Sequence, residues 1–276
     1  MKKIFIVLTL ISSVLVACNK GENPDNGFNR IGASASNPPA NTKAHVDFVY
    51  MQQVWDAGDC ISVFTAKIPN GRRFTLATEE GLSTAEFVSD EVVNDTTCYY
   101  ALYPASAAGE ASFSSFGDEL TVNYPASASF NYDNFSGDCC NFMVAKSTDK
   151  FFFFKNIFSY IEFSVNGPDG DAIRSIVIEG QNEEIISGTA EVTFNADVPD
   201  VSFVSGGKSI TVDFGEDGLA FPTDVFDISV PPVLSLGFSV TVNTVNGVSK
   251  TFKSAPCPEF LINTVISMGE IDMGTN

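Results

Sequence analysis

Apolar and polar side chains alternate one by one along several segments in the second half of the chain. In one of these segments, Ile161, Phe163 and Val165 are separated by the polar residues Glu162 and Ser164. The same alternation runs through residues 189–194, 209–214, 226–230 and 238–243. Successive side chains of a β-strand point to opposite faces, so a period of two places all the apolar residues on one face. The pattern predicts strands that each bury one face and expose the other.

Turn-forming residues separate these segments at regular spacing. Asn, Gly, Pro and Asp fill residues 166–170, and glycines stand at 206–207. Asn246 and Gly247 lie between two apolar stretches, and both tolerate the positive φ that a type I′ hairpin turn requires. Short strands separated by turns are typical of an antiparallel sandwich or barrel. We therefore expect an all-β fold.

The first half of the chain has a less regular pattern. Three strands are predicted, at residues 60–64, 99–104 and 120–124. Residues 105–117 and 126–138 are predicted loops. No long helical period occurs, and residues 84–93 could hold one or two helical turns at most.

Four consecutive phenylalanines, residues 151–154, open the regular half of the chain. Four consecutive side chains of a strand cannot share one face, so this block predicts a strand that is buried on both faces. We place a domain boundary here, which gives a first domain at residues 44–154 and a second at residues 155–276.

The first residues form a predicted signal peptide. Two lysines and an apolar run at residues 4–14 precede Leu-Val-Ala-Cys at residues 15–18. The run is shorter than the roughly 20 residues of a membrane span, and the small Ala17 suits a signal peptidase. Leu-Val-Ala-Cys resembles the lipobox of bacterial lipoproteins, which predicts cleavage between Ala17 and Cys18 and lipid on the Cys18 thiol. The alternative is an ordinary secretory signal followed by a chance cysteine.

Residues 18–43 are rich in Asn, Gly, Pro, Ser and Ala, and they predict a flexible tether. Glu22 and Asp25 resemble the acidic surface-export signal of Bacteroidetes lipoproteins, although ordinary linker composition explains them equally well. Stable lipid anchoring takes two or more acyl chains, a condition that this modification would meet. We expect a lipoprotein of the cell outer membrane that faces the exterior.

Charge and reactive residues argue against several classes of function. The formal net charge of -19 repels phosphate backbones, which excludes nucleic acid as a partner. The one histidine, His45, is too few for Ser-His-Asp catalysis or for a multi-histidine metal site. The glycines before Lys208 and Ser209 resemble the end of a phosphate loop, but an alternating strand follows them, so they predict a hairpin turn. We expect no enzyme, no cofactor and no metal.

The six cysteines do not define a disulfide framework. With Cys18 lipidated, five remain, and adjacent Cys139 and Cys140 form a poor framework motif. The spacings match neither a zinc knuckle nor a redox Cys-x-x-Cys. The cysteines therefore predict small buried residues, with one bridge at most and no assigned pairing.

An ordered set of short motifs resembles the fimbrillin-like lipoproteins of the Bacteroidetes. The motifs are TK at 42–43, WDAGDCISVF at 55–64, YYALYP at 99–104, NFMVAK at 141–146, FFFKN at 152–156 and NTVI at 263–266. They span nearly the whole chain behind the lipobox. One departure is visible, because Asn156 stands where many relatives have histidine, which puts any role of that imidazole in doubt.

The resemblance implies two transthyretin-like β-sandwich domains in tandem and a structural role in a surface pilus, as a stalk, anchor or tip subunit that contributes to adhesion. In stalk subunits of the family, an arginine-specific protease removes the first strand, and the exposed groove accepts a strand of another subunit. The partners implied are other pilus subunits, in a homopolymer or heteropolymer, and a host or bacterial surface ligand.

Two segments match these roles. Arg30-Ile31 is the candidate maturation cleavage site, and the alternative is that Arg30 is a linker residue of an uncut anchor or tip subunit. The candidate donor strand is the apolar segment 260–273, and the alternative is a permanent edge strand of its own domain. Its apolar residues are Phe260, Ile262, Val265, Ile266, Met268, Ile271 and Met273.

A second hypothesis is a surface glycan-binding lipoprotein. Such proteins hold sugars on exposed aromatic rings. The available rings are Trp55, Tyr99, Tyr100, Tyr103, Tyr124 and Tyr132. We expect Trp55 in the core, because large aromatic residues mostly supply buried area.

Overall fold

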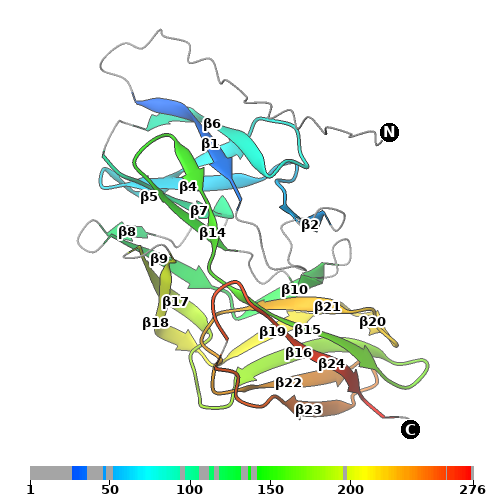
Figure 1. Ribbon diagram of the computed structural model, residues 1–276. Coiled ribbons are helices and arrows are strands. Elements are labelled where there is room, and N and C mark those ends of the chain that lie inside the picture. Colours follow the sequence, from blue (N-terminus) through cyan, green and yellow to red (C-terminus); the bar gives the residue numbers. More distant parts are fainter. Residues whose placement is uncertain are drawn as a thin grey trace, which may run out of the picture.

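The computed structural model describes residues 27–35, 46–47, 52–93, 97–105, 112–114, 118–131, 136–137, 142–194, 198–258 and 260–274. Residues 1–17, Cys18, His45, Tyr132 and the Cys139-Cys140 pair lie outside these ranges. Throughout the described ranges, the regular elements are strands, and none is an α-helix (Figure 1). The expected all-β fold is confirmed in this part of the chain.

The upper part of the molecule is an eight-stranded sheet in the order β13-β1-β6-β5-β4-β7-β12-β14 (Figure 1). Its strands are β1 (Phe28–Ser34), β4 (Cys60–Thr65), β5 (Ile68–Leu76), β6 (Thr84–Val93), β7 (Tyr99–Tyr103), β12 (Met143–Ser147), β13 (Phe151–Phe153) and β14 (Lys155–Asn156). A separate small pair joins β2 (Val46–Asp47) to β3 (Gln52–Gln53). The terminal strands β13 and β14 follow each other directly along the chain, so one continuous stretch links the two ends of the sheet.

The lower part contains a ten-stranded and a four-stranded sheet. The ten-stranded sheet contains β10 (Ser127–Asn131), β11 (Ser136–Gly137), β15 (Ser159–Asn166), β16 (Ala172–Gly180), β19 (Ser209–Asp213), β20 (Leu219–Ala220), β21 (Phe226–Val230), β22 (Phe238–Thr244), β23 (Ser249–Lys253) and β24 (Val265–Asp272). The four-stranded sheet contains β8 (Ser112–Ser114), β9 (Glu119–Tyr124), β17 (Ser187–Thr193) and β18 (Asp200–Gly207).

The five alternating segments of the second half all lie on strands, namely β15, β17, β19, β21 and β22. Their apolar residues are buried as predicted, except Phe194, which follows the end of β17 and is partly buried. In β22, for example, Val240 and Val242 have no exposed surface, whereas Thr241 between them is partly exposed. The period of two therefore identified the buried face correctly.

The helical expectation for residues 84–93 is wrong, because the whole stretch forms β6. Ala85 and Phe87 alternate into the core, and β6 pairs with β1 and β5. The predicted loops also contain short strands. β8 lies within residues 105–117, and β10 and β11 lie within residues 126–138. Their neighbours in the sheets stabilise strands that are too short for a periodic signal.

Two turn predictions need correction. β22 and β23 do form the expected hairpin, but Gly247 has a φ of 84° and Asn246 does not adopt positive φ, so the turn is not type I′. Residues 206–207 do not form a hairpin turn. β18 pairs with β17, whereas β19 pairs with β16 and β10, so the chain passes there from one sheet to another.

Two separate hydrophobic cores lie inside these sheets. The smaller core belongs to the eight-stranded sheet and includes Trp55, Ile61, Phe87 and Phe154. The larger core fills the lower part and also contains Phe64, Tyr100, Leu102 and Val144 of the eight-stranded sheet. β9 and β10 contribute to it through pairing with β17 and β19. The division into residues 44–154 and 155–276 remains a prediction.

The phenylalanine block does not bury both faces, so that prediction is wrong. Phe152 and Phe154 point into the smaller core, whereas Phe153 is 69% exposed. Phe151 and Phe153 share the outer face, with ring centroids 4.9 Å apart. The exposed Phe153 ring shows that no second layer covers this face at its position.

Candidate functional site

β1 occupies an interior slot of the eight-stranded sheet. It pairs antiparallel with β6 on one side and parallel with β13 on the other. Its apolar side chains Phe28, Ile31 and Ala33 are buried in the smaller core. Residues 28–34 are therefore a structural strand, and the predicted flexible tether does not include them. Asn29, Gly32 and Ser34 resemble linker composition in the sequence, so the strand shows no clear alternation there.

Gly32 allows β1 to lie close to the start of the phenylalanine block. Its amide donates a hydrogen bond to the Lys150 carbonyl at 3.0 Å. A Cβ at this position would lie 2.5 Å from a ring carbon of Phe151, which is closer than two carbon atoms can approach. The outer face of β1 is thus closed by an aromatic ring that only glycine accommodates without a shift.

Arg30 lies on the outer face of β1, and its side chain is 61% exposed. It forms an ion pair with Glu86 of β6, which raises the pKa of the Arg30 guanidinium. The backbone at Arg30 pairs with Val88, and a bulge interrupts the register between Phe28 and Arg30. The charged head is therefore accessible to a protease, but the Arg30-Ile31 peptide bond lies in a paired strand.

The start of β1 is held by aromatic contacts. Phe28 packs edge-on against Tyr99, with ring centroids 5.1 Å apart, and the Lys150 ammonium lies 5.3 Å from the Phe28 centroid. Phe28 is thus the side chain that fastens the part of β1 before Arg30.

The carboxy-terminal segment lies at the edge of the ten-stranded sheet. β24 pairs in parallel with β15 alone, along Val265 to Asp272 (Figure 1). Phe260, Ile271 and Met273 of the candidate donor strand are buried in the larger core. Its remaining apolar residues, Ile262, Val265, Ile266 and Met268, are half-buried. In this structure the segment is docked on the ten-stranded sheet as an edge strand, which is the arrangement of the alternative hypothesis.

Asn156 connects the stretch between the two cores to the segment that precedes β24. Its amide nitrogen donates to the Tyr160 hydroxyl at 2.5 Å and to the Asn263 side-chain oxygen at 3.4 Å. Its side-chain oxygen accepts a hydrogen bond from the Phe158 amide at 3.0 Å. A second contact runs from the Ser159 hydroxyl to the Leu261 carbonyl at 2.6 Å. Asn156 therefore has a structural role.

Sequence reasoning had identified Asn156 and Asn263 only as motif positions. A buried polar residue between apolar neighbours is a signal, because such groups are nearly always hydrogen-bonded. The partner could not be identified from the sequence, because Asn156 and Asn263 lie 107 positions apart.

Most of the aromatic residues nominated as sugar platforms are buried. Trp55 has no exposed surface, so its predicted place in the core is confirmed. Tyr99, Tyr100 and Tyr124 are at most 2% exposed, and Tyr103 is half-buried. These rings provide packing area and not an open platform.

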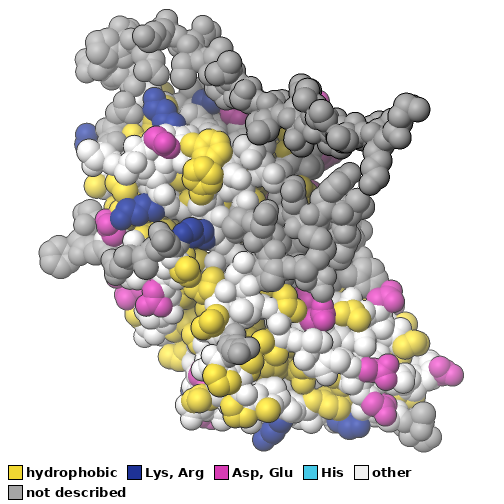
Figure 2. Space-filling model, in the orientation of Figure 1, with side chains coloured by type: hydrophobic (Ala, Val, Ile, Leu, Met, Phe, Trp, Pro, Cys, Tyr) yellow, Lys and Arg dark blue, Asp and Glu magenta, His cyan; other side chains and the backbone are white. Residues whose placement is uncertain are grey.

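Reactive centres are sparse in the described ranges. Cys60, Cys98 and Cys257 are all free thiols there. Among the residues that the structure describes, no three His, Cys, Asp or Glu side chains gather into a possible metal site. No helix in those residues is long and apolar enough to cross a membrane. Figure 2 shows Asp and Glu side chains scattered over the visible face.

Comparisons with known proteins give similarity at the level of structure only. No family model matches the sequence, and neither does any curated protein. A candidate cell adhesion protein from Bacteroides uniformis has a TM-score of 0.43 at 16% identity, over 81% of this chain and 83% of that one. A fimbrial protein from Bacteroides ovatus has a TM-score of 0.41 at 10% identity, over 92% of this chain and 51% of that one.

The tip fimbrial protein Mfa3 from Porphyromonas gingivalis, with a C-terminal truncation, has a TM-score of 0.32 at 6% identity, over 81% of each chain. All three structures carry names of adhesion or fimbrial proteins, and none is named as an enzyme. At these scores and identities, the similarity does not establish the family of this chain.

Proposed function

We propose that this chain is a structural subunit of a cell-surface pilus that joins its neighbours by strand exchange. The observation that carries the proposal is the position of β1. A strand near the amino terminus fills an interior slot, hydrogen-bonded on both sides, with an exposed arginine near its start. Loss of such a strand would open a slot with unpaired backbone groups and empty apolar pockets, which an incoming strand can satisfy.

The proposed anchor is the lipid on Cys18, which would hold the subunit on the outer membrane at the cell surface. The proposed architecture is two transthyretin-like sandwiches in tandem, residues 44–154 and 155–276. The smaller core supports a separate amino-terminal sandwich, while the larger core combines buried residues of both ranges. The subunit would contribute to adhesion as a stalk, anchor or tip component, with other subunits and a surface ligand as partners.

Cleavage at Arg30-Ile31 would remove Phe28 and its contacts with Tyr99 and Lys150. Residues 31–34 would remain, held in the core by Ile31 and Ala33. Burial of two such side chains contributes roughly 2 to 4 kcal/mol, which a longer apolar strand can exceed. A cut at this point would therefore make β1 exchangeable.

The proposed donor is the segment 260–273. β24 has one neighbour, β15, so it can leave the sheet without opening an interior slot. When the segment leaves the sheet, Phe260, Ile271 and Met273 become exposed. The acceptor slot of the next subunit must then bury a similar apolar area.

The test is treatment of the purified full chain with an arginine-specific protease, followed by electrophoresis in detergent without boiling. We expect a ladder of oligomers and a new amino terminus at Ile31. Arg30→Ala should prevent both, while Met268→Asp should permit the cut and abolish the ladder. A cut protein that stays monomeric, or a ladder that survives Arg30→Ala, would contradict the proposal.

The glycan-binding alternative loses its original support, because four of its six aromatic residues are buried.

A further inference from the structure

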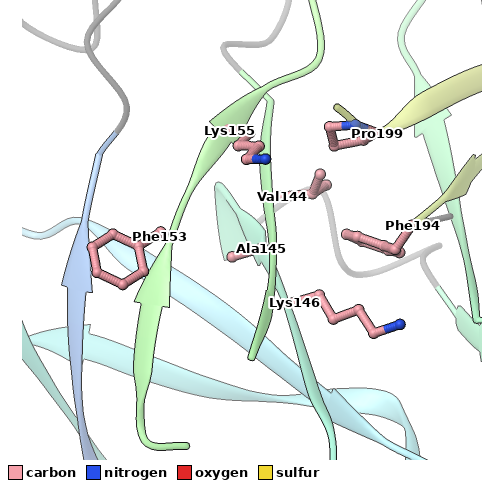
Figure 3. A pocket seen from close by; sticks show the side chains of 7 residues that line it. All are labelled: Val144, Ala145, Lys146, Phe153, Lys155, Phe194 and Pro199. Carbon is pink, nitrogen blue, oxygen red and sulfur yellow. The ribbon is translucent and has the colours of Figure 1, made fainter. Parts of the chain in front are cut away.

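A cavity of about 320 Å³ lies between the eight-stranded sheet and the β17–β18 hairpin (Figure 3). β12 contributes Val144, Ala145 and Lys146 to its wall, and Phe153 and Lys155 come from β13 and β14. Phe194 and Pro199 close the opposite side. Figure 3 shows the two lysine side chains extending from adjacent strands toward Phe194 and Pro199.

The charge of this wall is opposite to that of the chain. The protein has 34 acidic and 15 basic residues, yet the seven lining residues that belong to the described ranges include two lysines and no carboxylate. Long-range repulsion between an anion and the acidic surface is damped beyond a Debye length of about 8 Å at physiological salt. A local lysine contact is screened much less, so this cavity can attract an anion.

Lys146 and Phe194 are fixed in place. The Lys146 ammonium lies 2.6 Å from Asp118, and the Tyr100 hydroxyl donates to the same carboxylate at 2.5 Å. These two hydrogen bonds lower the pKa of Asp118, which keeps the ion pair at neutral pH. The Phe194 ring packs against Tyr100, with centroids 5.2 Å apart.

Lys155 supplies the uncompensated charge. It is half-buried on β14, and no carboxylate of the described residues pairs with it. Since Asp118 already neutralises Lys146, the wall offers about one net positive charge to a ligand. That balance suits a single carboxylate better than a phosphate dianion, which proteins prefer to hold with arginine or clustered backbone N–H groups.

The remaining wall decides what carries the carboxylate. Val144, Ala145 and Pro199 are buried, so the accessible apolar surface of the wall comes from half-buried Phe194 and exposed Phe153, and the volume is at the lower end of small-molecule sites. A pyranose ring offers a C–H face for the Phe194 ring, and it fills this space better than a carboxylate side chain does. We propose that this cavity binds a sugar ring that carries a carboxylate, such as a uronic or sialic acid unit of a glycan.

The proposal is independent of strand exchange, because the cavity includes no residue of β1 or β24. Its test is saturation-transfer NMR on the full chain, with the methyl glycosides of glucuronic acid and N-acetylneuraminic acid. The reference ligands are neutral methyl glucoside and acetyl-glutamate amide. We expect at least one acidic sugar to bind with a dissociation constant near 1 mM, and both reference ligands to bind at least about tenfold more weakly.

Variants locate the site. Lys155→Met and Phe194→Ala should each weaken binding about tenfold or more, and Lys155→Arg should keep it within about threefold. Lys253→Met, on exposed β23, is the matched control and should change nothing. Circular dichroism checks that each variant is folded, and the protease ladder should be unaltered in Lys155→Met.

The proposal is overturned if neither acidic sugar gives a signal at about 10 mM, or if Lys155→Met binds like the unaltered chain. If methyl glucoside binds as tightly as the acidic sugars, the positive charge of Lys155 has no role in binding and the proposal is wrong. Equal binding of acetyl-glutamate amide would identify an acidic peptide site instead.

Discussion

β1 and β24 are both short strands near an end of the chain, but their surroundings differ. β1 lies between β6 and β13, with hydrogen-bonding neighbours on both sides. β24 lies at a sheet edge and pairs with β15 alone. Because an interior strand satisfies two sets of backbone groups, its removal opens a defined slot, whereas an edge strand leaves only a new edge. In the proposed strand exchange, the slot of β1 would therefore be the acceptor and β24 the donor.

The largest expected loss of stability comes from truncating a buried apolar side chain in one of the two strands. Ile31→Ala should destabilise the protein by about 2 to 5 kcal/mol, because Ile31 is 2% exposed and the cavity cannot fill with water. Ile266→Ala is the matched change on β24, where the side chain is half-buried, and we expect about 1 kcal/mol. Urea unfolding of both variants measures the contrast, and equal losses would refute it.

The next largest loss of stability is expected where β1 lies close to the Phe151 ring. Gly32→Ala places a Cβ 2.5 Å from the Phe151 ring and should lower stability by about 1 to 3 kcal/mol. Phe151→Ala in the same chain should restore part of the loss, because it removes the atoms in contact. A double-mutant cycle measures the coupling. Additive losses would mean that the ring does not restrict position 32.

A smaller effect is expected at the attachment of β24. Asn156→Ala should destabilise by about 1 to 3 kcal/mol, since it leaves the buried Phe158 amide without its partner. Hydrogen exchange should become faster at Asn263 and along β24, and stay unchanged along β1. Asn182→Ala, at an exposed turn, is the control. Faster exchange in β1 alone would contradict the assigned role.

The smallest effect is expected at Arg30. Arg30→Ala removes an exposed ion pair with Glu86, whose small contribution to stability decreases with salt. Thermal unfolding at low and high salt should therefore differ little from the unaltered chain. A loss of several kcal/mol would show that Arg30 holds β1 in place and is not mainly a surface residue.

Strands of the second half were predictable because their signal is local. Alternation along β15, β17, β19, β21 and β22 reveals the buried face within five to eight residues. β8 and β11 were missed because strands of two or three residues do not show a period, and β10 was missed because its small residues Ser127, Ala128 and Ser129 resemble a loop. β6 was missed because its polar residues near the middle weaken the alternation, whereas its two sheet neighbours determine its structure.

The amino-acid sequence by itself determined the all-β class and the acidic surface, because strand periodicity and charge are properties of neighbouring residues. It also supplied the predicted lipid attachment at Cys18. Only the tertiary structure placed residues 28–34 inside a sheet, exposed Phe153, and brought Lys146 and Lys155 together with Phe194. Those arrangements depend on pairing between segments that are distant in the sequence. The residues next to each segment do not indicate which segment it pairs with.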